Sequence, residues 1–216
     1  MTVIYQDRND TAFLKKIYEG LEDTKAVVCK YDTPVENRMK AEAAIRTEPD
    51  RIAMLGHGTQ LGLLNPNFYG YVVNGSNAHM LKDKNVIAIW CWAGNFMQRQ
   101  RLTGFSTSMF ISEENEALYM GFPEAREEDI HRENDIFSER VRALIDANVD
   151  LKQWPELLRS QADMSKPFVK FNYDGLSYYY NGIKMDRFER EQSRKIYEKI
   201  SGLSDLPGNA AELRKR

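Results

Sequence analysis

The sequence has few cysteines and histidines and no long apolar run, and each shortage excludes a class of protein. Two cysteines, Cys29 and Cys91, in 216 residues are too few for a disulfide framework. Three histidines are present without Cys-x-x-Cys or His-x-x-x-His spacing, which argues against a structural zinc site. No apolar run approaches the roughly 20 residues of a membrane span, so we expect no membrane partner.

Net charge is also nearly absent. Lysine and arginine number 30 against 32 acidic residues, which gives a formal net charge of -2. This balance creates no global field toward nucleic acid, so we expect no nucleic-acid partner. Residues 1–8 lack the charged and apolar regions of a secretory signal, and we therefore expect a cytoplasmic protein. No Gly-x-Gly-x-x-Gly or Gly-Lys-Ser element follows an expected strand, and we expect no cofactor.

What the sequence does contain is the composition and patterning of a globular α/β protein. Hydrophobic residues make up 42% and charged residues 29%, which are ordinary values for a globular chain. The opening third alternates short apolar runs with helical periodicity. Strands are predicted at 3–5, 26–31 and 52–55, and helices at 10–21 and 33–45. This alternation predicts a mostly parallel sheet between two layers of helices.

The remainder of the chain continues this pattern less regularly. Residues 59–84 are rich in turn signals and predict a small hairpin or an extended excursion. Further strands are predicted at 86–90 and 104–111, and helices at 95–102, 124–148, 151–161 and 185–200. Residues 168–180 predict a hairpin around Asp174-Gly175. We therefore expect one α/β domain over 1–216, with 123–216 as a helical and hairpin extension packed on it.

Two of the apolar strands end abruptly in residues that can do chemistry. One ends in Gly56-His57-Gly58, and the other ends in Cys91 followed by small residues. Catalytic groups in α/β sheets gather outside the carboxyl ends of the strands. If the two strands are neighbours, the imidazole and the thiol can approach each other. Cys29 lies within its strand and is interpreted as a buried apolar residue.

A cysteine beside a histidine is the arrangement that nucleophilic catalysis requires. A thiolate attacks a carbonyl, and an imidazole takes the thiol proton and later returns it to the leaving amine. The amides of Gly58 and Cys91 are the predicted donors to the developing oxyanion. A helix predicted to begin after Cys91 would lower the pKa of its thiol through the positive helix end.

The same residues resemble a known group of enzymes. Leu55-Gly56-His57-Gly58 and Ile89-Trp90-Cys91-Trp92-Ala93-Gly94 are similar to the motifs of the caspase-like cysteine peptidase clan, and most similar to the separase and CHAT versions. The resemblance covers roughly residues 1–120. It implies a caspase-like α/β/α sandwich and a His57–Cys91 dyad that acts on a protein or peptide substrate.

The resemblance also implies a pocket that selects the substrate side chain before the scissile bond. Trp90 and Trp92 stand where the clan usually has smaller residues, and we assign both to the walls of this cleft. Glu113 and Glu114 follow the strand that borders the pocket, where a carboxylate would favour arginine or lysine. The alternative for this acidic run is a solvated turn.

Two other functions remain open. One is a catalytically inactive caspase-like fold that binds a protein partner, with the tyrosine-rich segment 168–180 or the charged helix 185–200 as the interface. The other is a nucleotide- or small-ligand-binding domain in which Gly56-His57-Gly58 is a phosphate loop. The leading prediction is a cysteine peptidase-like hydrolase, with cleavage after a basic residue.

Overall fold

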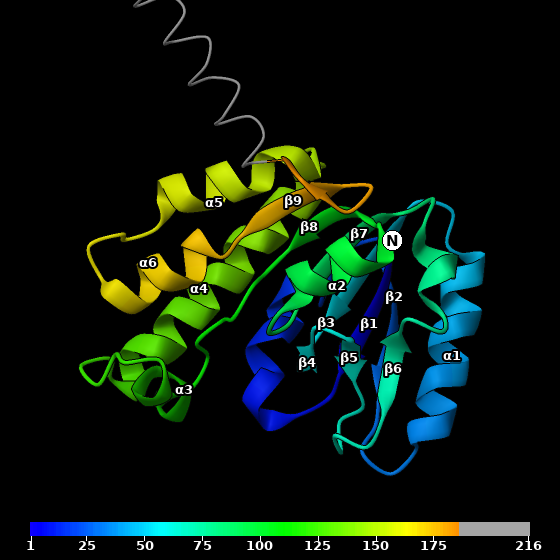
Figure 1. Ribbon diagram of the computed structural model, residues 1–216, viewed down its shortest axis with the longest axis horizontal. Coiled ribbons are helices and arrows are strands. Elements are labelled where there is room, and N and C mark those ends of the chain that lie inside the picture. Colours follow the sequence, from blue (N-terminus) through cyan, green and yellow to red (C-terminus); the bar gives the residue numbers. More distant parts are fainter. Residues whose placement is uncertain (186–216) are drawn as a thin grey trace, which may run out of the picture.

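The computed structural model describes residues 1–185 as an α/β fold built on a seven-stranded mixed sheet (Figure 1). The strand order is β10-β9-β8-β7-β3-β1-β2. The strands are β1 (Thr2–Gln6), β2 (Lys25–Cys29), β3 (Arg51–Leu55), β7 (Asn85–Ile89), β8 (Thr103–Ser106), β9 (Ser177–Tyr180) and β10 (Ile183–Lys184). The first five pair in parallel, and β9 and β10 are antiparallel to their neighbours. The predicted mostly parallel α/β sheet is therefore confirmed.

A second, three-stranded antiparallel sheet lies between β3 and β7 in the chain. It comprises β4 (Gly58–Thr59), β5 (Gly62–Leu64) and β6 (Tyr71–Asn74). The α-helices are α1 (Pro34–Thr47), α2 (Ala93–Gln100), α3 (Glu114–Tyr119), α4 (Glu127–Asp146), α5 (Trp154–Gln161) and α6 (Pro167–Asp174). The 3-10 helices are η1 (Asn9–Ile17), η2 (Ala78–Leu81) and η3 (Leu151–Gln153).

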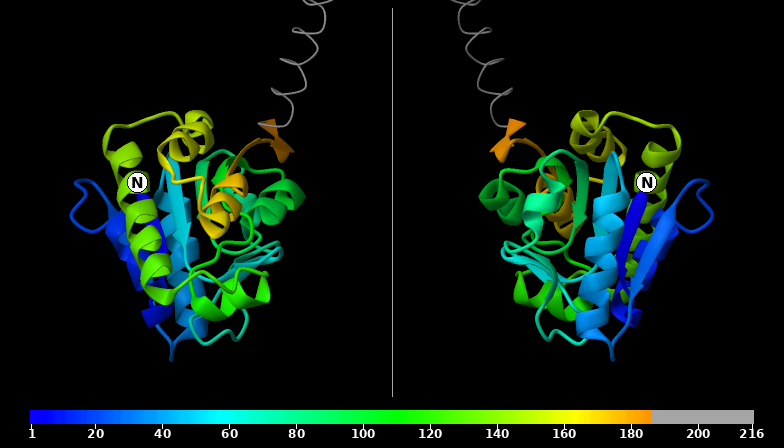
Figure 2. Two further views of the ribbon diagram at one scale, coloured as in Figure 1. Left: turned by 90° about the vertical axis from the view of Figure 1, so that its left-hand side faces the viewer. Right: turned by 90° about the vertical axis from the view of Figure 1, so that its right-hand side faces the viewer.

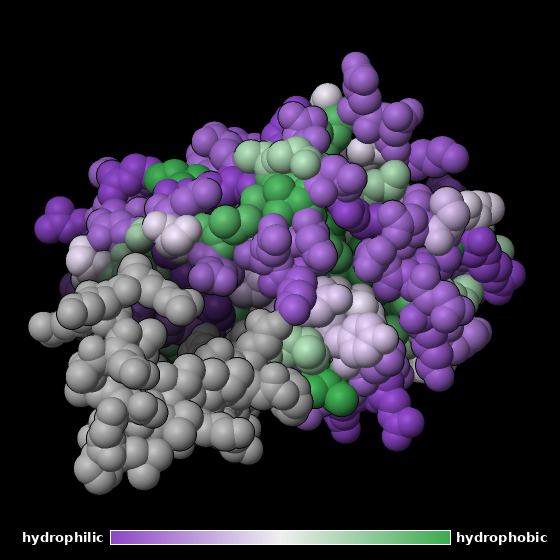
Figure 3. Space-filling view, turned by 90° about the horizontal axis from the view of Figure 1, so that it is seen from above, coloured by the Kyte–Doolittle hydropathy of each residue, from purple (hydrophilic) through white to green (hydrophobic). Residues whose placement is uncertain are grey.

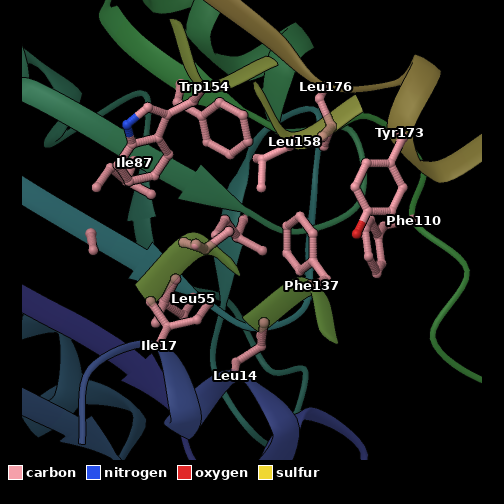
Figure 4. Close-up of a cluster of buried hydrophobic side chains, with 14 of the residues drawn as sticks. Leu14, Ile17, Leu55, Ile87, Phe110, Phe137, Trp154, Leu158, Tyr173 and Leu176 are labelled. Atoms are coloured by element: carbon pink, nitrogen blue, oxygen red, sulfur yellow. The ribbon is translucent and has the colours of Figure 1, made fainter. Parts of the chain in front are cut away.

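Helices cover both faces of the large sheet. Successive side chains of each central strand point to opposite faces and are therefore buried in two different cores. Leu55 of β3 packs with Phe137 of α4 on one face (Figure 4). Met54 packs with Ile45 of α1 on the other face. Figure 2 shows α1 lying along this face of the sheet. The unbroken apolar runs of β3 and β7 follow from this burial on both sides. The outer surface in Figure 3 is mostly hydrophilic, as expected outside the two cores.

The prediction of a hairpin over 168–180 is wrong in its first half. Residues 167–174 form helix α6, which begins with Pro167 at its first turn and ends at Gly175. Phe168, Val169, Asn172 and Tyr173 are the buried residues of this helix, and this spacing is helical. The hairpin lies later, between β9 and β10, and turns at Asn181-Gly182. Both turn residues have positive φ, 50° and 78°, as a type I′ turn requires.

Another predicted element is shorter than expected. The strand predicted over 104–111 ends at Ser106, and the segment that follows is anchored by side chains instead. The Asn172 side chain makes two hydrogen bonds to the Ile111 backbone, at 2.7 and 2.9 Å. Apart from Met185, the helix predicted over 185–200 lies outside the described residues. No helix in the described part of the chain has both the length and the apolar character needed to cross a membrane.

Candidate active site

His57 and Cys91 lie at the same edge of the sheet, just beyond its two central strands. β3 and β7 pair in parallel with Leu55 opposite Ile89, and each reactive residue follows its strand by two positions. The condition for the two side chains to approach each other, that their strands are neighbours, is met. Both residues line one small cavity of about 30 Å³, which we call the dyad cavity. Phe110 and Leu14 also line it.

The backbone at His57 is fixed by Gln6, a fully buried residue at the end of β1. The Gln6 side-chain oxygen accepts a hydrogen bond from the His57 amide at 2.6 Å, and its nitrogen donates to the carbonyls of Leu64 and Asn65. Gly56 has a φ of +148°, and a Cβ there would lie 2.4 Å from the Gln6 Cβ. Only glycine lets the chain pass this close to Gln6. The first glycine of the motif therefore positions the histidine.

The second glycine of the motif makes room for Trp90. A Cβ on Gly58 would lie 2.1 Å from the Trp90 ring, and the indole N–H donates to the Thr59 carbonyl at 3.0 Å. Trp90 is only 2% exposed. It contributes to the lining of the dyad cavity, but its indole holds the His57 loop in place. Trp90 thus connects the ends of the two strands, whereas the sequence predicts that it forms the wall of an open cleft.

The turn that carries Cys91 is held by Thr107. The Thr107 hydroxyl accepts a hydrogen bond from the Trp90 amide and donates one to the Trp90 carbonyl, at 3.1 and 2.8 Å. Helix α2 begins two residues after Cys91, with Trp92 as its N-cap in a left-handed conformation. Trp92 is 45% exposed and does not line the dyad cavity. The structure therefore does not place Trp92 in the wall of the dyad cavity, although the sequence predicts it in the wall of the substrate cleft.

The surroundings of the Cys91 thiol favour its protonated form. Burial raises the pKa of the Cys91 thiol to about 11, and the charge of Glu116 acts in the same direction. The lowered pKa expected from the helix end is not found, because burial removes hydration from a thiolate. The sulfur lies 3.7 Å from the Phe110 carbonyl oxygen. A base must remove the thiol proton before Cys91 can act as a nucleophile.

The predicted oxyanion donors differ in what surrounds them. The Cys91 backbone N–H has no hydrogen-bond acceptor among residues 1–185. An amide without a partner beside the nucleophile is suited to an oxyanion. Gly58 belongs to β4 and pairs with Leu63 of β5. The oxyanion role of its amide stays a prediction.

Asp10, at the start of the helix predicted over 10–21, lies beside His57. Asp10 does not cap η1, whose N-cap residue is Arg8. Its Oδ1 atom lies 3.2 Å from His57 Nε2. Burial by itself would raise the pKa of the Asp10 carboxyl, but the Arg8 hydrogen bonds and the neighbouring His57 outweigh it and hold that pKa below its ordinary value. Asp10 lies within η1, beyond the end of β1, and no motif in the sequence marked it as a partner of His57.

A larger acidic cavity of about 390 Å³ adjoins the dyad cavity and shares Phe13 and Ser112 with it. Asp10, Glu113 and Asp135 supply its carboxylates, and we call it the acidic cavity. Lys16 also lines it and pairs with Asp135 at 2.9 Å, so Glu113 is the carboxylate there without an ion pair among the described residues. Burial raises the pKa of the Glu113 carboxyl, and the charges of Asp10 and Glu116 add to the rise.

The two glutamates predicted for the substrate pocket are placed differently. Glu113 lines the acidic cavity and forms no ion pair with any of the residues described. Glu114 is exposed at the start of α3 and does not line either cavity. The structure therefore brings Glu113, and not Glu114, close to His57.

Within residues 1–185, no group of three or more His, Cys, Asp or Glu side chains is placed to hold a metal ion. The residues brought together at the carboxyl ends of β1, β3 and β7 are a thiol, an imidazole and a carboxylate. This set can transfer protons and form a covalent bond to a carbonyl carbon. Comparisons of the chain with protein-family models, with curated proteins and with solved structures found no match.

Proposed function

We propose that this protein is a cysteine peptidase-like hydrolase with a caspase-like α/β/α sandwich, in which His57 and Cys91 form the catalytic dyad. The observation that carries the proposal is the shared position of the two residues. Each follows one of two adjacent parallel strands by two positions, and both line the dyad cavity. The resemblance of their motifs to the caspase-like clan supports the same assignment.

The reaction proceeds in two balanced steps. His57 takes the thiol proton of Cys91 as the sulfur forms a bond to the carbonyl carbon of the scissile peptide. The proton then passes to the leaving nitrogen as the C–N bond breaks, which leaves a thioester on Cys91. Water, activated by His57, hydrolyses this thioester and restores the thiol. The free Cys91 amide supports the negative charge on the carbonyl oxygen in both steps.

The charge of the acidic cavity supports cleavage after a basic residue. Glu113 is partly buried, forms no ion pair with any described residue, and is repelled by Asp10 and Glu116 more than Arg8 and His57 attract it. A guanidinium or ammonium group in the acidic cavity would relieve this repulsion and pair with the carboxylate. Arginine and lysine are therefore the proposed side chains before the scissile bond.

One observation favours a second candidate, a catalytically inactive caspase-like fold that binds a protein partner. The dyad cavity of about 30 Å³ is too small for a peptide. It has room for about two water molecules. An active enzyme must therefore open this cavity when substrate binds, whereas a binding module has no need to open it.

A peptide electrophile distinguishes the two candidates. The probe is a short peptidyl acyloxymethyl ketone with arginine next to the reactive group, and matched probes carry alanine or glutamate there. We expect the arginine probe to label Cys91, and not Cys29, under reducing conditions, with the site identified by mass spectrometry. His57→Ala should abolish labelling. Failure of all three probes to label Cys91 in the folded protein would favour the inactive binding module.

The same probe tests the acidic cavity. Glu113→Gln should slow labelling by the arginine probe about tenfold, because it removes a charge-assisted contact. It should leave labelling by the alanine probe unchanged. Glu128→Gln is the matched control, because Glu128 is exposed on α4, away from both cavities. Equal slowing of both probes would show that Glu113 does not select the side chain.

A further inference from the structure

We infer that Asp10 is a positioning residue of this site. Held by Arg8, its carboxylate keeps the proton of neutral His57 on Nε2, so that Nδ1 is free to take the proton of Cys91. The inference rests on the proposed function and adds a third group to the dyad. Asp10 is on η1, 47 residues before His57 in the chain, so only the fold brings them together.

Among residues 1–185, the contact with Asp10 is the only polar one that the His57 imidazole makes. His57 Nε2 is buried and lies 3.2 Å from Asp10 Oδ1, without an aligned hydrogen bond to any described residue. A buried N–H without an acceptor is costly, so a small tightening of this contact is favourable. Such contacts are commonly loose before substrate binds. Asp10 is therefore the acceptor to which Nε2 can donate.

Arg8 fixes the Asp10 carboxylate in place. Its guanidinium binds Asp10 through Nε at 3.0 and 3.1 Å and through Nη2 at 2.6 Å. Nη1 donates to the Pro66 carbonyl at 2.8 Å. An arginine held at two points by a carboxylate and at a third by the backbone leaves the carboxylate little freedom.

Phe68 closes a ring of contacts around the histidine. The Arg8 guanidinium lies 4.4 Å from the centre of the Phe68 ring, and that ring meets the imidazole edge-on at 5.4 Å. The contacts therefore form a closed ring of four residues, in the order Arg8, Asp10, His57 and Phe68. The imidazole is held on its Nε2 side by Asp10 and on a face by Phe68, which restricts its orientation.

The protonation of His57 follows from the chemistry of the carboxylate. An ionised carboxylate accepts hydrogen bonds and donates none, so it selects the tautomer that carries hydrogen on Nε2. Nδ1 then keeps its lone pair and makes no hydrogen bond with any of residues 1–185. Because the Cys91 thiol is protonated at rest, this lone pair is what the first step requires. When the proton arrives, the carboxylate stabilises the imidazolium.

The test compares the wild type with Asp10→Asn, Asp10→Glu and Asp129→Asn. The last is a matched control, because Asp129 also pairs with an arginine, Arg132, but on the exposed face of α4. Long-range ¹⁵N–¹H NMR of histidine side chains gives the tautomer, and hydrolysis of an arginyl peptide gives kcat and KM. We expect the Nε2–H tautomer in the wild type. The asparagine amide can donate to Nε2, so Asp10→Asn should shift His57 toward the Nδ1–H tautomer.

The kinetic signature separates positioning from a loss of binding. Asp10→Asn should lower kcat about 100-fold or more, because it removes the tautomer in which His57 can take the thiol proton. Because Asp10 also lines the acidic cavity, an alanyl peptide is the substrate on which KM should stay within about twofold. Asp10→Glu should keep the tautomer and restore a large part of kcat. Asp129→Asn should match the wild type in tautomer and kinetics.

The outcomes separate this inference from the proposed function. An Nδ1–H tautomer in the wild type overturns the inference, and this result needs no variant to fold. An unchanged tautomer and kcat in Asp10→Asn also overturns it, while activity of the wild type keeps the proposed function. If the wild type cleaves no peptide but its tautomer responds to Asp10→Asn as expected, the proposed function fails and the positioning of His57 by Asp10 stands.

Discussion

The two cysteines of this protein have similar thiols and very different neighbours. Cys29 ends the edge strand β2, and Cys91 follows the central strand β7. Burial raises the pKa of Cys29 to about 12 and that of Cys91 to about 11. Neither thiol is activated by its own surroundings. What distinguishes Cys91 is a histidine across the same cavity, which is itself held by a carboxylate.

The packing around each thiol shows the difference. Cys29 is fully buried in the core on the α1 side, among side chains such as Ile4 and Ile45. Cys91 is partly exposed and shares with His57 a cavity whose other lining residues are mostly apolar. Central strands of a parallel sheet end beside each other, whereas an edge strand has one neighbour. The same residue type therefore fills a core at one strand end and forms a candidate nucleophile at the other.

The largest expected difference between the cysteines is in activity. Cys91→Ala should reduce arginyl peptide hydrolysis by about 1000-fold or more, because it removes the atom that forms the covalent bond. Cys29→Ala should retain activity within about twofold, since Cys29 lies in the other core. Steady-state kinetics on the folded variants measures both. Equal activity of Cys91→Ala and the wild type would remove Cys91 from the mechanism.

The second difference is in the pH dependence of alkylation. Only the thiolate reacts, and its fraction rises about tenfold for each pH unit below the pKa. Because the pKa of Cys91 lies at about 11, its rate with iodoacetamide should rise about 100-fold from pH 7 to pH 9 without a plateau. Cys29 should stay unmodified while the fold persists.

Mass spectrometry of the two cysteine peptides follows both rates at once, and Cys29→Ala provides a control for the Cys91 curve. A rate for Cys91 that is already constant near neutral pH would reveal a thiolate paired with an imidazolium. That result would contradict a resting thiol that needs His57 as its base. It would also agree with the lowered pKa of the Cys91 thiol that the sequence predicts.

The parts of the site that depend on local sequence patterns could be predicted from the sequence. The apolar runs of β3 and β7 end at His57 and Cys91, and parallel pairing of such strands follows from burial on both faces. Helix α6 was missed although its helical spacing was present, because Asp174-Gly175 was interpreted as the turn of a hairpin. Glycine there ends a helix instead.

The parts that could not be predicted depend on contacts across the fold. The Trp90 side chain fits against Gly58 because the sheet places the two strand ends together. Asp10 meets His57 because η1 folds back beside β3, and no local pattern marks such a pair. The raised pKa of Cys91 depends on its burial, which the fold determines. These effects depend on packing between residues that are far apart in the chain, and local sequence patterns do not predict such packing.

The smallest expected difference is in stability. Cys29→Ser places a hydroxyl in an apolar core without an obvious acceptor, so it should lower the free energy of unfolding by about 1–2 kcal/mol. Cys91→Ser should lower the free energy of unfolding by about 0.5 kcal/mol or less. Cys91 is partly exposed, and the Phe110 carbonyl can accept a hydrogen bond from the new hydroxyl. Urea unfolding measures both, and Cys29→Ala separates loss of volume from burial of the hydroxyl. Equal costs at the two positions would mean that Cys91 is packed as a core residue, which would weaken its assignment as a nucleophile.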